Sequence, residues 1–377
     1  MQKKVLVLGA TGSIGTNTLS LIRSMPERFT VCGLTANHER EKLELLSDEF
    51  KCPFALAEND GIKGIEQLIK SSGADIAVNG IAGAAGLLPS VYSLLAGIDL
   101  ALANKETVVM AWPVVQKIAA EHGARIIPVD SEHSAVLSLI SKCGRESIDR
   151  IIITASGGPF RTYTKEQLAA VTPEDAMRHP TWSMGIKITI DSASLANKGL
   201  EVIEACRLFD IPPERVQVAV HPQSLVHSLV RTQDGVLYAQ ISEPDMRHPI
   251  VSALTWPECA RNTLAPYDLT AGLAEGERAT LTFEKPRMAD FPMLGYAYEA
   301  AAKGGAHTIA YNAANEVAVS AFARRRISFM QIPDVVREVL DKDWNCEIPD
   351  IESVLIADRR ARQAAEAAIA RWQGAAQ

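Results

Sequence analysis

The sequence predicts an α/β protein with a parallel-sheet N-terminal domain, a mixed α+β middle domain and an α-helical C-terminal domain. Two patterns predict this fold class. About 120 N-terminal residues alternate short β-branched runs with helical periodicity, and helical periodicity alone dominates residues 287–377. Alternation of strands and helices is typical of a parallel sheet that helices cover on both faces.

Aliphatic runs of strand length mark the expected strands of the N-terminal domain. They lie at Val5–Leu8, Thr30–Leu34, Ile76–Val78, Leu100–Ala103 and Ile126–Val129. Helical periodicity between them predicts helices at Thr18–Arg23, Arg40–Phe50, Leu87–Leu95 and Pro113–His122. The uncharged stretch from Ile76 to Ile98 contains Asn79, Pro89 and four glycines. It therefore predicts strand, loop and buried helix rather than a membrane span.

The rest of the chain changes character after the first domain. A strand is expected at Ile151–Thr154, and Asp234-Gly235 predicts a hairpin that joins Ser228–Arg231 to Val236–Ile241. Residues 263–286 carry several Pro and Gly residues with little periodicity, which predicts a linker. Helices are then expected at Leu294–Lys303, Ile309–Arg324, Ile332–Asp341 and Asp358–Trp372. The expected domains are residues 1–121, 122–262 and 287–377, with 263–286 as the linker.

Composition excludes several classes of protein. The chain has 377 residues with a formal charge of −7 and no cluster of Lys and Arg, so nucleic acid is not an expected partner. The six cysteines are widely spaced and form no CxxC or Cys/His metal pattern, which indicates reduced thiols. No long signal core follows the first aliphatic run. We expect a cytoplasmic protein that does not span a membrane.

A glycine-rich segment, Gly9-Ala10-Thr11-Gly12-Ser13-Ile14-Gly15, follows the first strand and opens a helix. Glycine lets the backbone approach a pyrophosphate, and N–H groups at the helix start bind it, so this junction favours a dinucleotide over a plain turn. The second strand ends in Ala36-Asn37-His38 without the acid that usually selects NAD. This favours NADPH, with His38 or Arg40 near the 2′-phosphate, although Glu39 between them opposes it and both could be plain helix-start residues.

Carboxylates gather in two segments of the sequence. Asp130 and Glu132 follow the strand Ile126–Val129 and share a face if the backbone is extended, and Glu201 and Glu204 share a face of a helix. If the segments meet, the cluster needs a cation, and oxygen ligands suit Mg²⁺ or Mn²⁺. The alternative is that Asp130 caps a helix and that both glutamates lie on a solvated face.

Turns with hydroxyl, amide and ammonium groups provide candidate phosphate sites. Ser156-Gly157-Gly158 follows the strand at 151–154 and can present backbone amides to phosphate. Ser192, Ser194, Asn197 and Lys198 lie at a helix entrance, where turn and cap chemistry alone would also favour them. Between these segments, His179 to Gly185 places Trp182 and Met184 among loop formers, which suggests a lid or a packed loop.

Together these segments resemble the 1-deoxy-D-xylulose-5-phosphate reductoisomerase family over nearly the whole chain. The resemblance is carried by nine ordered motifs, which are Gly9–Gly15, Ala103–Glu106, Val129–His133, Ala155–Phe160, His179–Gly185, Asp191–Glu201, His221–Ser224, Pro244–Arg247 and Asn312–Glu316. It implies a Rossmann-like NADPH-binding domain, a catalytic α+β domain and a homodimer. It also implies NADPH-dependent rearrangement and reduction of 1-deoxy-D-xylulose 5-phosphate to 2-C-methyl-D-erythritol 4-phosphate, assisted by Mg²⁺ or Mn²⁺.

The resemblance also assigns roles to residues. It implies that Asp130, Glu132 and Glu201 hold the metal ion beside Glu204, and that Lys198 and His179 join them in catalysis. The implied substrate contacts are Ser131, Ser156, His179, Trp182, Met184, Ser192, Asn197, Lys198 and Met246. The implied dinucleotide contacts are Thr11, Gly12, Ser13, Ile14, Ala36, Asn37, His38, Asn104, Lys105 and Glu106. Family members often carry Asn where this chain has Glu39, so the resemblance does not fix the details of 2′-phosphate recognition, although the overall assignment stands.

Two other functions compete with this one. An NADP-dependent dehydrogenase could reduce a phosphorylated aldehyde without rearranging its skeleton, and its product would be unbranched. A catalytically silent NADPH-binding regulator would need the fold but would have no use for Asp130, Glu132, Glu201 and Lys198.

Overall fold

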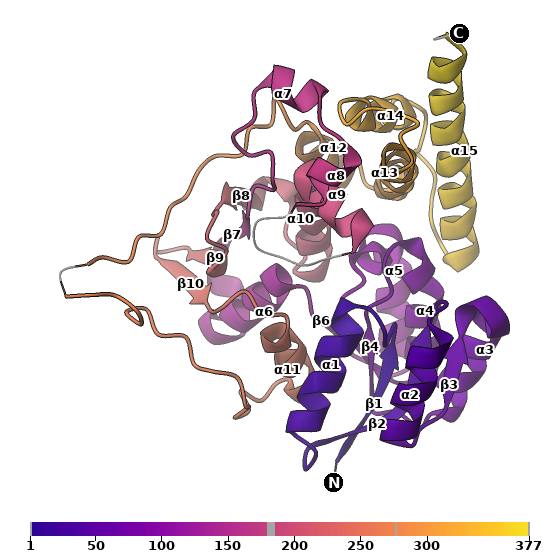
Figure 1. Ribbon diagram of the computed structural model, residues 1–377, viewed down its shortest axis with the longest axis vertical. Coiled ribbons are helices and arrows are strands. Elements are labelled where there is room, and N and C mark those ends of the chain that lie inside the picture. Colours follow the sequence, from indigo (N-terminus) through magenta and orange to yellow (C-terminus); the bar gives the residue numbers. More distant parts are fainter. Residues whose placement is uncertain (1, 179–184, 276, 376–377) are drawn as a thin grey trace. The chain divides into compact units, whose positions relative to one another are not determined.

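A computed structural model describes residues 2–178, 185–275 and 277–375 (Figure 1). Its chain packs as two compact units. The first combines Met1–Ser134 with Met246–Leu264, and the second combines Ala135–Asp245 with Ala265–Gln377. Each unit has its own sheet.

A six-stranded parallel sheet forms the centre of the first unit, in the order β3-β2-β1-β4-β5-β6. Val5 to Leu8 of β1 are all completely buried, which is why this strand is a continuous aliphatic run. The strand order reverses between β1 and β4, where ligands of open α/β sheets bind. The strands are β1 (Lys3–Leu8), β2 (Phe29–Ala36), β3 (Phe54–Leu56), β4 (Ile76–Asn79), β5 (Asp99–Leu102) and β6 (Ile126–Pro128).

Helices lie on both sides of this sheet (Figure 1). Helix α1 packs on α11, whereas α3, α4 and α5 pack on one another in sequence. The helices are α1 (Ser13–Ser24), α2 (Arg40–Phe50), α3 (Ala57–Ser71), α4 (Leu87–Leu95), α5 (Lys105–Glu121), α6 (Ser131–Cys143) and α11 (Arg247–Thr255), with a short 3₁₀ turn at Ala84–Gly86. The predicted strands and helices of this region are thus confirmed, and the boundary between the units falls inside α6.

Three features of this unit differ from the sequence prediction. Strand β3 and helix α3 were not expected, because β3 has only three residues and Gly61, with a φ of 62°, interrupts the helical pattern of α3. Helix α5 begins at Lys105 rather than near Pro113, since the chain accommodates the proline by a kink at Ala111. The backbone at Glu132 is helical, so the extended backbone that would place Asp130 and Glu132 on one face is not formed, and the alternative that Asp130 caps a helix holds.

The second unit contains a mixed sheet in the order β10-β9-β7-β8. Strands β7 (Ile148–Ala155) and β8 (Val216–Val220) are parallel, and β9 (Val226–Thr232) pairs antiparallel with β7 and with β10 (Leu237–Ile241). The predicted hairpin is confirmed, with Gly235 at a φ of 86° in its turn. In residues 263–275 and 277–286 the only strand pairing is one bridge, between Glu284 and Val220.

All four predicted C-terminal helices are present in this unit. They pack with α10 into a helical layer, because α12 lies on α10 and α13 lies on α14 and α15. The contact between α12 and α10 joins the C-terminal helices to the unit that contains the mixed sheet. The two compact units therefore divide the chain at other positions than 121/122 and 262/263. The helices are α7 (Lys165–Ala169), α8 (Pro173–Ala176), α9 (Ile186–Ala193), α10 (Ala196–Leu208), α12 (Met293–Lys303), α13 (His307–Ala323), α14 (Gln331–Leu340) and α15 (Ile351–Ala375), with 3₁₀ turns at Arg145–Ser147 and Pro213–Arg215.

Two expectations about the whole chain concern membranes and thiols. Across the described helices, none combines the length and the apolar character that crossing a bilayer requires. The stretch from Ile76 to Ile98 folds as β4, a 3₁₀ turn and α4, as predicted. All six cysteines are free thiols.

Candidate active site

The glycine-rich loop joins β1 to α1 in the first unit. A Cβ on Gly15 would lie 2.3 Å from the carbonyl oxygen of Gly9, so only glycine allows α1 to approach the turn this closely. The Gly9 amide donates to the Thr35 hydroxyl at 3.0 Å, which fixes the loop to β2. The first helical turn carries no acidic residue. Amides of the first turn of α1, among Thr11 to Ile14, therefore suit an anion.

The end of β2 lies beside this loop. Ala36 is buried, and Asn37 and His38 are exposed. The carboxylate of Glu39 accepts a hydrogen bond from the Thr11 side chain, which lowers the pKa of Glu39, and Lys42 lies 3.6 Å away. Lys42 also donates to the Thr11 carbonyl oxygen at 2.9 Å. Lys42, which the sequence argument missed, thus places a second cation near this corner and partly neutralises Glu39.

Asn104 caps helix α5 and is almost completely buried. Its side-chain oxygen accepts from the Thr107 amide at 3.0 Å, and its side-chain nitrogen donates to the carbonyl oxygens of Ile81 and Gly83. A Cβ on Gly86 would lie 2.5 Å from Cγ of Asn104. Asn104 therefore fixes the loop after β4 to the start of α5, the helix that carries Lys105 and Glu106.

The acidic segment after β6 meets the lysine that follows β5. Because these parallel strands are neighbours, their carboxyl ends share one edge, and the ammonium of Lys105 lies 2.9 Å from Oδ2 of Asp130. Oδ1 of Asp130 accepts from the amide of Glu132 at 3.1 Å and contacts Nδ1 of the buried His133 at 3.0 Å. The Ser131 hydroxyl donates to Glu132 at 2.5 Å. Asp130 thus caps α6, and it is also held between a cation and an imidazole.

The second carboxylate segment lies on α10 of the second unit. Glu201 and Glu204 are both 1% exposed, so the alternative of a solvated face is excluded for them. Lys198 forms an ion pair with Glu201, and the amide of Asn197 donates to Glu201 at 2.5 Å. A buried carboxylate requires such partners. This face of α10 therefore concentrates acidic oxygens beside one buried ammonium.

The two serine turns expected to bind phosphate come together in this unit. Gly157 and Gly158 have φ values of 85° and 69°, and the Gly158 amide donates to the Ser156 hydroxyl at 3.3 Å. A Cβ on Gly158 would lie 2.7 Å from the carbonyl oxygen of Ser192. The turn after β7 thus packs directly on the end of α9. Ser194 is buried and bonds to the Asp191 carbonyl oxygen, so it serves the turn itself.

Of the remaining expected substrate residues, the structure describes only Met246. His179, Trp182 and Met184 lie outside the described residues. Met246 lies at the start of α11 in the first unit and is half-buried.

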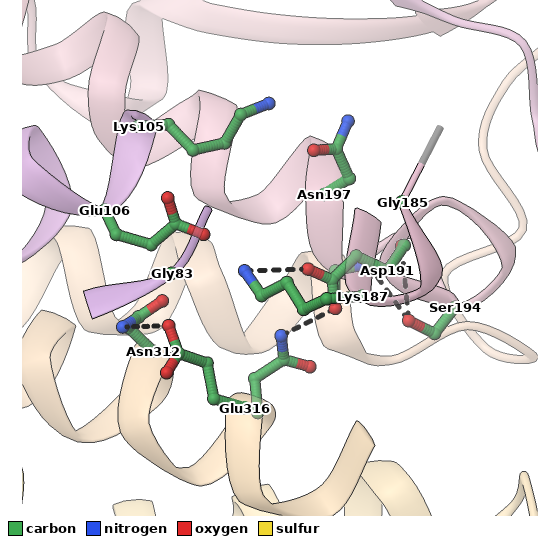
Figure 2. A network of polar contacts seen from close by, with 12 residues as sticks. Gly83, Lys105, Glu106, Gly185, Lys187, Asp191, Ser194, Asn197, Asn312 and Glu316 are labelled. Atoms are coloured by element: carbon green, nitrogen blue, oxygen red, sulfur yellow. Dashed lines mark hydrogen bonds and ion pairs between the residues drawn. The ribbon is translucent and has the colours of Figure 1, made fainter. Parts of the chain in front are cut away.

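A buried network behind the phosphate turns was not expected from the sequence (Figure 2). Asp191 of α9 is 1% exposed, its Oδ2 lies 3.0 Å from the ammonium of Lys187, and its Oδ1 accepts from Asn315 of α13 at 2.8 Å. In the sequence, the Asn312–Glu316 motif carries only the family resemblance and has no predicted role. Its contact with Asp191 joins residues 124 positions apart, which no local pattern reveals.

Comparison with known proteins identifies the family. Models of 1-deoxy-D-xylulose 5-phosphate reductoisomerase match residues 5–61 and 54–112, and models of its C-terminal domains match 126–209 and 241–364. The chain is 46% identical to the reductoisomerase of Treponema denticola, with 98% of this chain and 97% of the relative covered. It is also 46% identical to that of Treponema pallidum, with 98% and 99% covered.

Solved structures agree with the sequence relatives. A crystal structure of DOX-P reductoisomerase in complex with NADPH, fosmidomycin and magnesium superposes with a TM-score of 0.90 at 35% identity, covering 98% of this chain and 99% of that one. The reductoisomerase from Zymomonas mobilis in complex with NADPH gives a TM-score of 0.89 at 38% identity, with the same coverage. With its Rossmann-like first sheet, mixed second sheet and C-terminal helices, this chain belongs to the 1-deoxy-D-xylulose 5-phosphate reductoisomerase family.

Proposed function

We propose that this protein converts 1-deoxy-D-xylulose 5-phosphate to 2-C-methyl-D-erythritol 4-phosphate in the non-mevalonate isoprenoid pathway, using NADPH and Mg²⁺ or Mn²⁺. Family membership supports the reaction, and relatives are solved with NADPH and magnesium. The observation that carries the proposal is the Ser156–Gly158 turn against Ser192, on the same unit as the buried Lys198–Glu201 pair. A regulator without catalysis would have no use for this pair.

NADPH is assigned to the first unit. Thr11, Gly12, Ser13 and Ile14 would bind the pyrophosphate at the start of α1, where helix amides and the positive end of the helix dipole meet. Ala36, Asn37 and His38 would lie at the adenosine end, with Lys42 as a further cation for the 2′-phosphate. Asn104, Lys105 and Glu106 would lie toward the nicotinamide. Asn104 would act there by fixing the loop, since its side chain is bonded to protein groups.

The donor set fits a magnesium-type ion. Asp130 and Glu132 of the first unit and Glu201 of the second offer only carboxylate oxygens, which Mg²⁺ and Mn²⁺ prefer, and Glu204 would support them. When bound, the ion polarises the substrate carbonyl and stabilises negative charge on oxygen. His133 holds the carboxylate of Asp130 in one orientation, as partners of metal ligands commonly do. Lys105 neutralises the same carboxylate.

The sugar phosphate is assigned chiefly to the second unit. Ser156, Ser192, Asn197 and Lys198 supply two hydroxyls, an amide and an ammonium, which together match a phosphate. Ser131 and Met246 of the first unit would contact the same substrate. His179, Trp182 and Met184 are assigned to the substrate side as well, with Trp182 and Met184 in a covering loop. A phosphonate such as fosmidomycin, bound by a relative, should occupy this place.

We also propose that the protein is a cytoplasmic homodimer. Support for the dimer comes from β10, which lies at the edge of its sheet and exposes Leu237, Tyr238 and Ile241, with Val236 exposed in the turn before it. A free edge with apolar side chains is a usual place for association. Six free thiols support a reducing compartment.

The decisive experiment follows NADPH absorbance with purified protein and 1-deoxy-D-xylulose 5-phosphate, with and without Mg²⁺ or Mn²⁺, and with NADH in parallel. We expect metal-dependent oxidation of NADPH and a branched polyol phosphate, identified by NMR. An unbranched product would instead establish a simple dehydrogenase. Binding of NADPH without any turnover would point to the regulator.

A further inference from the structure

The proposed phosphate site depends on the end of helix α9, because Ser192 is the residue that follows Asp191 in its last turn. Gly158 packs on the Ser192 carbonyl oxygen, where a Cβ would lie only 2.7 Å away. A shift of α9 would therefore move Ser192 and the Ser156 turn together. Whatever fixes this end of α9 also sets the geometry of both hydroxyls.

The Asp191 side chain has one contact within its own helix and one with another helix. Lys187 belongs to α9 itself, one turn earlier, so its 3.0 Å ion pair cannot fix α9 to the rest of the unit. Asn315 belongs to α13 and is completely buried. Its 2.8 Å hydrogen bond to Oδ1 therefore joins the Asp191 side chain to a different helix. Figure 2 marks the hydrogen-bond and ion-pair contacts of the Asp191 carboxylate with dashed lines.

Helix α13 also contacts the start of α10, through Tyr311, which lies one turn before Asn315. The hydroxyl of Tyr311 donates to the Met293 carbonyl oxygen at 3.1 Å and lies 3.5 Å from that of Ala196. A Cβ on Gly199 would lie 2.5 Å from this hydroxyl. Tyr311 is therefore wedged against the first turn of α10, which carries Asn197 and Lys198. Burial raises the pKa of Tyr311 well above its usual value, so the hydroxyl remains a donor at neutral pH.

We propose that Asn315 is a positioning residue for phosphate binding, which through Asp191 holds the end of α9 that carries Ser192 in place. It touches no substrate in this role. The identity of the substrate in this inference rests on the proposed function. The positioning role of Asn315 requires only that a phosphate group binds at these turns. Tyr311 gives the same helix a second contact, with the α10 side of the site.

The test compares Asn315→Leu, which keeps the volume and removes the donor, with Thr308→Val. Thr308 is also buried on α13 and accepts a 2.6 Å hydrogen bond from Arg207 near the far end of α10. We expect Asn315→Leu to raise the KM for the sugar phosphate and the inhibition constant of inorganic phosphate by about tenfold, since small misplacements of binding groups have large effects. The kcat should change less than about threefold, and the NADPH dissociation constant should not change.

Thr308→Val should leave all of these constants at wild-type values. Asn315→Ser provides a milder variant if the leucine variant does not fold, and it should shift both constants in the same direction. Unchanged phosphate inhibition in folded Asn315 variants, or equal shifts in Thr308→Val, would overturn the inference.

Failure of the proposed function can be told apart from failure of this inference. If the wild-type protein turns over no substrate, the proposed function fails, and the inference is then tested by titrating inorganic phosphate and following its ³¹P NMR signal. Weaker binding by Asn315→Leu than by wild type would support the inference. Equal binding would refute it.

Discussion

Asp130 combines two tasks. It caps α6 through the amide of Glu132, and it lies 2.9 Å from the ammonium of Lys105. The cap needs only an oxygen, whereas a metal ion is attracted by the charge. Substitution can therefore separate the two tasks.

Asp130→Asn should keep the cap and lose the charge. Because Asn caps helices about as well as Asp, we expect the contribution of the cap to be kept and any loss of thermal stability to come from the ion pair with the buried Lys105, while the Mn²⁺ dissociation constant should rise by about tenfold or more. Calorimetric titration of Mn²⁺ into the NADPH-bound protein measures this. Asp130→Ala is the matched variant that also removes the cap and should lower the unfolding free energy by about 1 kcal/mol. Wild-type Mn²⁺ affinity in Asp130→Asn would remove this residue from the metal site.

Glu39 provides a second test at this scale. Its carboxylate bonds to Thr11 and lies 3.6 Å from Lys42, so Glu39→Gln should free Lys42 for the 2′-phosphate of NADPH. We expect the NADPH dissociation constant to fall by about threefold, as for an exposed charge in water, and that for NADH to stay unchanged. Fluorescence titration measures both. Glu66→Gln, which breaks only the exposed ion pair with Lys70 on α3, is the control, and an equal effect there would contradict the local explanation.

Single residues also show how far the sequence predicts the site. Spacing on α10 correctly placed Glu201 and Glu204 on one face, because a helix fixes which residues are neighbours, but the burial of that face depends on the fold. The Asp191–Asn315 contact could not be found in this way, since it depends on how α9 and α13 pack. Glu39 and Lys42 are three residues apart at the start of α2, so their spacing alone makes them neighbours, whereas the contact of Glu39 with Thr11 depends on the fold.

At the scale of elements, one ion-pair group ties α12 to α14. Glu299 of α12 bonds to Arg337 of α14 at 2.5 Å and to Lys303 at 2.7 Å. These partners lower the pKa of Glu299 from 4.5 to about 2. A carboxyl group whose pKa is depressed by folding stabilises the protein above its unfolded pKa, and this contribution is lost as the pH falls toward the folded value.

Glu299→Gln should therefore destabilise the protein at pH 7 and have little effect near pH 2. The side chain is 35% exposed, so solvent screening reduces the expected loss to about 0.5–1 kcal/mol. Denaturant unfolding of wild type and variant at pH 7, 5 and 3 measures it, and the difference should begin to shrink below about pH 4.5. A difference that is constant across this range would show that lost packing, rather than charge, is responsible.

Elements also differ in how well the sequence predicts them. The long C-terminal helices and the Asp234-Gly235 hairpin were predicted because periodicity and turn chemistry are local properties. The three-residue strand β3 lacks enough length for any periodicity. The segment after Asp130 left two alternatives open, extended backbone or a capped helix, because β6 ends at Pro128 and a helix cap resembles the last residue of a strand.

At the scale of the whole molecule, the proposed ligands are divided between the two units. The NADPH loop and two metal carboxylates belong to the first, and Glu201 with the phosphate turns belongs to the second. NADPH alone should then stabilise only the first unit, whereas a metal complex of a phosphonate inhibitor should engage groups of both. A ligand stabilises those parts of the native state to which it binds.

Hydrogen exchange measured by mass spectrometry on the full chain tests this division. NADPH alone should slow exchange in peptides that cover residues 9–24, with peptides covering 192–208 unchanged. Fosmidomycin with Mg²⁺ should slow exchange in 131–143 as well as in 192–208, because Asp130 and Glu132 flank the start of α6 while Glu201 and Lys198 lie on α10. Fosmidomycin without metal is the control, and it should protect mainly the phosphate turns of the second unit. If the metal added no protection at the start of α6, the carboxylates of the first unit would not be ligands, and the ion would have to be held by α10 alone.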